Sequence, residues 1–144
     1  EIASWIRRLR PGVVFAHDPW KRYRLHPDHR NAGFLATDGI VAARDPLFFP
    51  EINLEPHRPD HLLLWEADEV DHLEDVTSSL ETKIAALLEH QSQFHTTMQI
   101  SDGDPEAAKS ERETFRLRIT DRLAEAGAPE GIAYAEGFKR IDRL

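Results

Sequence analysis

Two histidines three residues apart, His26 and His29, stand at the expected start of a helix. Side chains three apart on a helix share a face, so both rings can point into one cleft. The pair follows an apolar, strand-like run at 13–16, and open α/β sheets bind ligands at the carboxyl ends of their strands. Neutral imidazole is a common metal ligand, so this spacing predicts a metal site. A catalytic zinc usually takes three protein ligands and a water, and this stretch supplies one or two of them.

The composition limits which residues could hold a metal. The chain has no cysteine, which excludes disulfides and thiolate zinc sites and leaves His, Asp and Glu as ligands. The 144 residues, 40% hydrophobic and 31% charged, are typical of one soluble globular domain or of part of a larger one. A net charge of −8 argues against a nucleic-acid surface, because phosphate binding needs clustered cations. The arginines at 7, 8 and 10 are interpreted as a solvated helix face.

The chain shows neither a membrane span nor a secretory leader. Its longest apolar runs, such as 62–65, are far too short to cross a bilayer. No charged and apolar leader precedes the first helix, so the sequence predicts a cytoplasmic protein. That helix begins at Glu1 without Met or a capping residue, and we therefore expect an upstream portion to be missing from the chain.

The hydrophobic periodicity predicts alternating helices and strands. Helices are expected at 2–9, at 28–43, from Thr77 or Ser78 to Phe94 with a capping box from Ser78 to Glu81, and at 105–126 behind an Asp104 cap. Buried strands are expected at 13–16 and 61–65, loops at 49–60 and 71–75, and a strand or helical turn within 131–141. This order fits an α/β layered domain with a parallel sheet. Because only two or three strands are visible, the first part of the domain is expected to be absent.

Several motifs together resemble the second half of an LmbE-like, or PIG-L-like, zinc-dependent N-deacetylase. They are Val-Val-Phe-Ala-His-Asp-Pro at 13–19, His-Pro-Asp-His-Arg-Asn-Ala-Gly at 26–33, Leu-Leu-Leu-Trp at 62–65, the helical stretch 83–93 and Ala-Glu-Gly-Phe at 135–138. The resemblance covers nearly the whole chain. It implies that residues 1–144 are the carboxyl-terminal part of a single LmbE-like domain, with a Rossmann-like fold and a mostly parallel sheet.

The resemblance also implies an activity and roles for residues. The reaction would be hydrolysis of an N-acyl group, typically acetyl, on an amino sugar or a related small conjugate, with zinc or another divalent metal bound. His29 would ligate the metal, and His26 would line the active site as an oxyanion donor or an acid. The family's other two ligands and its aspartate base come from an Ala-His-Pro-Asp-Asp motif, which this sequence lacks. We expect Asp28 to belong to the catalytic site with His26, where it would hydrogen-bond a neighbouring ring or cap the helix.

Other interpretations remain open at this point. A non-catalytic remnant of the fold could bind a sugar or a protein partner, and a homo-oligomer is compatible with the sequence. Asp18 either supports the site or forms a turn, and Arg24 either faces substrate or is a solvated loop cation. His90, Gln93 and Glu136 either lie near the active site or belong to the ends of their elements. The proline-rich loop at 49–60 is the expected place for substrate selectivity.

Overall fold

The computed structural model describes residues 1–144 except residue 102, and it divides the chain into two compact units. The first comprises Glu1–His72 and Gly137–Leu144, and the second comprises Leu73–Glu136. The first unit contains two helices and three strands: α1 (Ile2–Leu9), β1 (Val13–His17), α2 (Pro27–Arg44), β2 (His61–Trp65) and most of β4 (Ala135–Asp142). The second unit contains most of β3 (His72–Asp75) and the helices α3 (Leu80–Leu88) and α4 (Pro105–Gly127). No helix among the described residues has both the length and the apolar character needed to cross a membrane.

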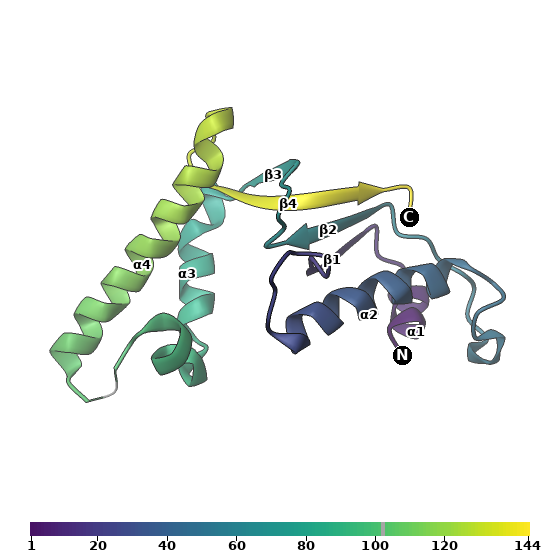
Figure 1. Cartoon of the computed structure of the whole chain (residues 1–144), viewed down its shortest axis with the longest axis horizontal. Coiled ribbons are helices and arrows are strands. Elements are labelled where there is room, and N and C mark those ends of the chain that lie inside the picture. The colour runs from purple at the N-terminus through teal and green to yellow at the C-terminus, as the bar shows by residue number, and fades with distance from the viewer. Residues whose placement is uncertain (102) are drawn as a thin grey trace. The chain divides into compact units, whose positions relative to one another are not determined.

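The strands form a sheet in the order β1-β2-β4-β3 (Figure 1). β1 and β2 are parallel, with Val13 opposite His61 and His17 opposite Trp65. β2 and β4 are antiparallel, with Trp65 opposite Phe138. The α/β class expected from the sequence is confirmed, and the parallel pairing joins the two expected strands. β2 is buried as expected, but the expectation of a buried β1 is wrong, because Val13 and Phe15 are exposed and only Ala16 is buried.

The core of the first unit forms where β1 and β2 meet α1 and α2, which lie on the same side of these strands (Figure 1). Alternate residues of the strands, among them Ala16, Leu62 and Leu64, are buried there against Ile6 and Ile40 of the helices. Glycine permits a close approach of α2 to the end of β1. A Cβ atom at residue 33 would lie 2.5 Å from the carbonyl oxygen of His17, so a larger side chain would push the start of α2 away from the strand.

The second unit is built from α3 and α4, which bury Leu80, Ile84 and Leu123 between them. The expected cap of α4 is confirmed, because the Asp104 carboxylate accepts the Glu106 N–H at 3.0 Å. A separate cluster of Phe94, Met98, Ile100 and Phe115 packs along α4.

Two predicted elements of this region are wrong. The expected helix from Thr77 or Ser78 to Phe94 is shorter, since α3 runs only from Leu80 to Leu88. The expected capping box from Ser78 to Glu81 does not form, because Ser78 lies inside a 3₁₀ turn before α3 and the Glu81 carboxylate pairs with Arg116. Thr77 does not cap α3 either, since its hydroxyl accepts the Tyr134 N–H. The expected loop at 71–75 contains strand β3, and the Asp71 N–H donates to the carbonyl of Phe138 beside it.

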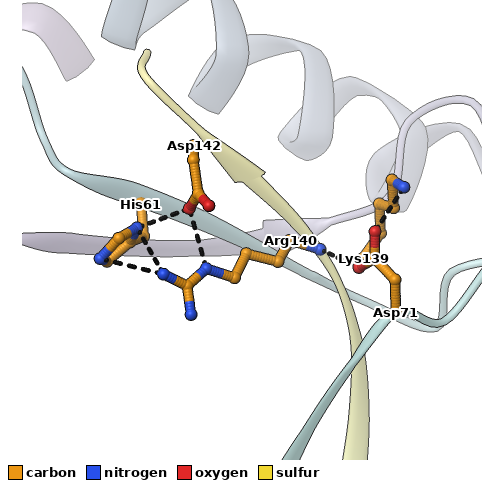
Figure 2. Close-up of polar contacts among 5 residues, drawn as sticks. All are labelled: His61, Asp71, Lys139, Arg140 and Asp142. Atoms are coloured by element: carbon orange, nitrogen blue, oxygen red, sulfur yellow. Dashed lines mark hydrogen bonds and ion pairs between the residues drawn. The ribbon is translucent and has the colours of Figure 1, made fainter.

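Charged side chains at the start of β2 and the end of β4 link these strands (Figure 2). His61 Nδ1 lies 2.6 Å from an Asp142 carboxylate oxygen, which also accepts Arg140 Nε–H at 2.8 Å. Asp71 accepts the Arg140 backbone N–H at 2.7 Å and the Lys139 ammonium at 2.6 Å. Arg140 and His61 hold the pKa of Asp142 below its usual range. The His61–Asp142 pair lies at the opposite end of β2 from Trp65.

Arg7 is buried, which overturns its interpretation as part of a solvated face. The residue is only 4% exposed, while Arg8 and Arg10 are exposed as expected. Its guanidinium donates to the carbonyls of Ala42, Ala43, Asp45 and Phe48 at 2.8–3.0 Å. The last carbonyls of a helix have no partner within the helix, so Arg7 satisfies the end of α2 from a neighbouring helix.

We expect Arg7→Met to lower the free energy of unfolding by about 3 kcal/mol or more, because it leaves several buried carbonyls without donors. Urea unfolding measures the change. Arg8→Met on the exposed side of the same helix is the matched control and should shift stability by less than about 0.5 kcal/mol. Equal effects of the two substitutions would contradict the capping role.

Candidate functional site

The parallel pairing of β1 with β2 brings the carboxyl ends of both strands together. His17 ends β1 opposite Trp65, and the Asp18 N–H donates to the Trp65 carbonyl at 3.2 Å. Glu66 follows Trp65 directly in the left-handed backbone region, with φ 54°. The His17 Nδ1 atom and a Glu66 carboxylate oxygen consequently lie 3.5 Å apart.

The start of α2 adds two more imidazoles at this edge. His26 is the N-cap of α2, and its Nδ1 accepts the Asp28 N–H at 3.3 Å. The His29 ring stacks on the His17 ring with centroids 4.2 Å apart, and on the His26 ring with centroids 4.7 Å apart. The structure therefore brings His26 and His29 together and adds His17, with His29 in the middle of the stack.

Asp28 differs in part from its expected place. The cap of α2 is the His26 ring, to which Asp28 contributes its backbone N–H. The Asp28 carboxylate is exposed and has no hydrogen bond to the other described residues. Its charge in the first turn suits the positive end of the helix dipole.

Arg24 is neither a solvated loop cation nor a free side chain. Its side chain is 5% exposed and contacts both His17 and Glu66. One guanidinium nitrogen lies 2.9 Å from His17 Nδ1, and another lies 3.1 Å from the Glu66 carboxylate. The Arg24 Nε atom is buried without a hydrogen-bond partner among the described residues. Arg24 therefore forms the cationic centre of this cluster.

The donors around His17 fix its tautomer. The Trp65 indole N–H, which can only donate, lies 2.7 Å from His17 Nδ1. Because Nδ1 accepts this bond, the proton of the neutral ring is on Nε2. Burial lowers the pKa of His17, and the nearby His29 and Arg24 lower it further. Burial acts to raise the pKa of Glu66, but Arg24 and His17 outweigh it and the pKa lies below its usual range.

Three residues could hold a metal ion, but their ligand atoms are not equally available. His17, His29 and Glu66 each offer a ligand atom, and these atoms lie within 4.8 Å of one another. Two imidazoles and a carboxylate are a donor set that zinc uses in catalytic sites. However, His17 Nδ1 already accepts a hydrogen bond and the Glu66 carboxylate is paired with Arg24. His29 fits a metal best, because its ring nitrogens have no hydrogen bond to other described residues.

Sequence reasoning missed His17, Trp65 and Glu66, although a signal for them was present. Both strands were recognised from their apolar runs, and polar or aromatic residues end each of them. The carboxyl ends of parallel neighbours meet at one edge, so these residues could have been placed together.

The structure also places the other residues whose roles the sequence left open. The Asp18 carboxylate accepts the Trp20 N–H at 2.9 Å, which supports a turn-forming role. Glu136 pairs with Lys83, and Gln93 accepts a hydrogen bond from the Thr97 hydroxyl. His90 is exposed just before a short 3₁₀ turn.

Comparison with known proteins supports the resemblance. The chain is 36% identical over 97 residues to the diacetylchitobiose deacetylase of Thermococcus kodakarensis, a match that covers 65% of this chain and 36% of that protein. The N,N'-diacetylchitobiose deacetylase structure from Pyrococcus horikoshii has a TM-score of 0.75 at 28% identity, over 98% of this chain and 49% of the other. The chain thus spans half or less of the length of these two proteins. No family model matches it.

Two further solved structures share the fold. The conserved protein TT1542 from Thermus thermophilus has a TM-score of 0.67 at 26% identity, over 99% of this chain and 56% of the other. GalB, the 4-carboxy-2-hydroxymuconate hydratase from Pseudomonas putida, has a TM-score of 0.69 at 20% identity, over 99% of this chain and 57% of the other. The GalB likeness shows the fold alone. With the two deacetylases, these findings confirm the resemblance that the motifs predicted.

We expect the His17 ring of the metal-free protein to titrate with a midpoint below its usual pKa of 6.5 in an NMR titration. The unfolded chain then binds more protons than the folded chain as the pH falls below that value. The contribution of His17 to stability is therefore complete above pH 6.5 and is lost as the pH falls through its lower folded pKa. His17→Gln should flatten this part of the stability profile, and a His17 midpoint at or above 6.5 would contradict the analysis.

Proposed function

Because the chain resembles LmbE-like deacetylases in sequence and in fold, we propose that it is the carboxyl-terminal part of such a domain. The protein that carries it would hydrolyse the N-acetyl group of an amino sugar or a related small conjugate. The observation that carries this proposal is the pair of stacked rings, His26 and His29, at the carboxyl ends of β1 and β2. The names of the two diacetylchitobiose deacetylases support the amino-sugar class.

We propose His29 as a ligand of zinc or another divalent metal. Such a metal, when bound, lowers the pKa of a water molecule and polarises the amide carbonyl. A catalytic zinc takes three protein ligands, and the described residues offer one unengaged imidazole beside the Arg24 cluster. The proposal therefore requires further ligands and a carboxylate base outside these 144 residues.

His26 is proposed as the catalytic residue next to the metal. Its Nδ1 accepts the Asp28 N–H, so the neutral ring carries its proton on Nε2. An Nε2–H group can donate to the negative charge that develops on the carbonyl oxygen. A protonated His26 can also deliver a proton to the leaving amine. Asp28 supports this role through its backbone, which fixes the tautomer of His26.

A non-catalytic sugar-binding or protein-binding module is the second candidate function. The engagement of Glu66 and His17 by Arg24 and Trp65 favours it, since the chain by itself offers few free ligands. The hydratase GalB has the same fold, so the fold does not define the reaction. Zinc content and deacetylation of an N-acetylated amino sugar separate the two candidates.

We expect His29→Ala to remove bound zinc and deacetylase activity from the protein that carries this chain. His26→Ala should retain zinc while kcat falls by about 100-fold to 1000-fold, because it removes one oxyanion donor or acid. Zinc is measured by atomic emission, and activity by acetate release.

His95→Ala, at an exposed histidine of the second unit, is the matched control and should leave both quantities unchanged. Retention of zinc and activity in His29→Ala would contradict the proposal. Zinc binding without any acetate release in the unmodified protein would favour the binding module.

A further inference from the structure

The guanidinium of Arg24 lies between His17 and Glu66, two residues whose side chains are spaced like ligands of one metal ion. His17 Nδ1 and the Glu66 carboxylate oxygen are 3.5 Å apart. Two ligand atoms at the usual zinc distances and a tetrahedral angle would be separated by about 3.4 Å. The guanidinium of Arg24 contacts both atoms, at 2.9 and 3.1 Å.

The Arg24 side chain is held inside the protein, although the residue before it is exposed to solvent. Tyr23 before it has a left-handed backbone, with φ 58°, and is 91% exposed, whereas the Arg24 side chain is 5% exposed. Another guanidinium contact is made to the Glu66 carbonyl at 3.3 Å. The buried Nε has no hydrogen-bond partner in the described part of the chain, so Arg24 is held there although this donor is unsatisfied.

A divalent cation could reach His17 Nδ1 and Glu66 only by displacing this guanidinium. Two cations at that separation repel each other, and the guanidinium cannot lose its charge by deprotonation. The Trp65 indole N–H, also bonded to His17 Nδ1, is a second obstacle to a metal at that nitrogen. His29 has neither obstacle, since its contacts are with the faces of His17 and His26.

We propose that Arg24 is a positioning residue that takes the place of a metal between His17 and Glu66. It keeps both groups out of the coordination shell and holds the His17 ring flat against His29, so that only His29 of the three is presented to a metal. This inference rests on the proposed role of His29 as a ligand.

The first test measures Zn²⁺ affinity by titration calorimetry for two matched variants of the protein that carries this chain. Both contain Trp65→Phe, which removes the indole donor, and they differ only in Arg24→Met against Arg24→Lys. Lysine retains a cation, whereas methionine does not. We expect the methionine variant to bind zinc at least about tenfold more tightly, a change as large as that from losing one supporting partner of a ligand. Adding Glu66→Gln should reverse the gain, and equal affinities of the two variants would overturn the inference.

The second test needs only one conservative substitution and covers the case in which those variants do not fold. Glu66→Gln in the otherwise unmodified protein should leave the zinc affinity unchanged, because Glu66 is the partner of Arg24 rather than of the metal. If Glu66 were a ligand, its loss would weaken binding by more than about tenfold. Such a loss would refute the role of Arg24 while leaving His29 as a ligand. Zinc affinity that is insensitive to His29→Ala would instead refute the proposed function.

Discussion

The candidate site depends on the parallel pairing of β1 with β2. With His17 opposite Trp65, the residues that end both strands meet at one edge, and the turn at Glu66 directs its carboxylate toward His17. The same edge receives the start of α2, because Gly33 lets the helix pass against the carbonyl of His17. A register shift of one residue would move His17 to the other face of the sheet and separate it from both His29 and Trp65.

Electrostatics then decides what this edge can bind. The Arg24 side chain is largely withdrawn from water, where an unpaired charge would be costly, so it requires the carboxylate of the half-exposed Glu66. Arg24 lowers the pKa of Glu66 and keeps it ionised, whereas burial first, then His29 and Arg24, lower the pKa of His17 and favour its neutral form. The three stacked imidazoles consequently differ in role. His17 belongs to the Arg24 cluster, and His26 is bonded to the backbone of α2. His29 lies between them, and its ring nitrogens have no hydrogen bond to the other described residues.

Local patterns in the sequence predicted much of the fold and part of the site. The two short apolar runs became β1 and β2 at nearly the expected residues, and Asp104 caps its helix as expected. The failures came from partners distant in the sequence. Thr77 could not cap α3 because its hydroxyl is used by Tyr134, 57 residues away. Arg7 looked solvated because its carbonyl partners lie 35 to 41 residues further along the chain. Arg24 could not be assigned for the same reason, since its carboxylate partner becomes apparent only once β1 and β2 are paired.

In our proposal, His29 is the ligand that this chain presents to a metal, and Arg24 withholds Glu66 from it. A crystal structure of the zinc-loaded protein, with anomalous scattering at the zinc edge, tests both parts in one measurement. We expect a zinc ion about 2.0–2.1 Å from a ring nitrogen of His29, with the Arg24 guanidinium still between His17 and Glu66. Zinc bound to Glu66 with Arg24 displaced, or zinc bound away from His29, would contradict it.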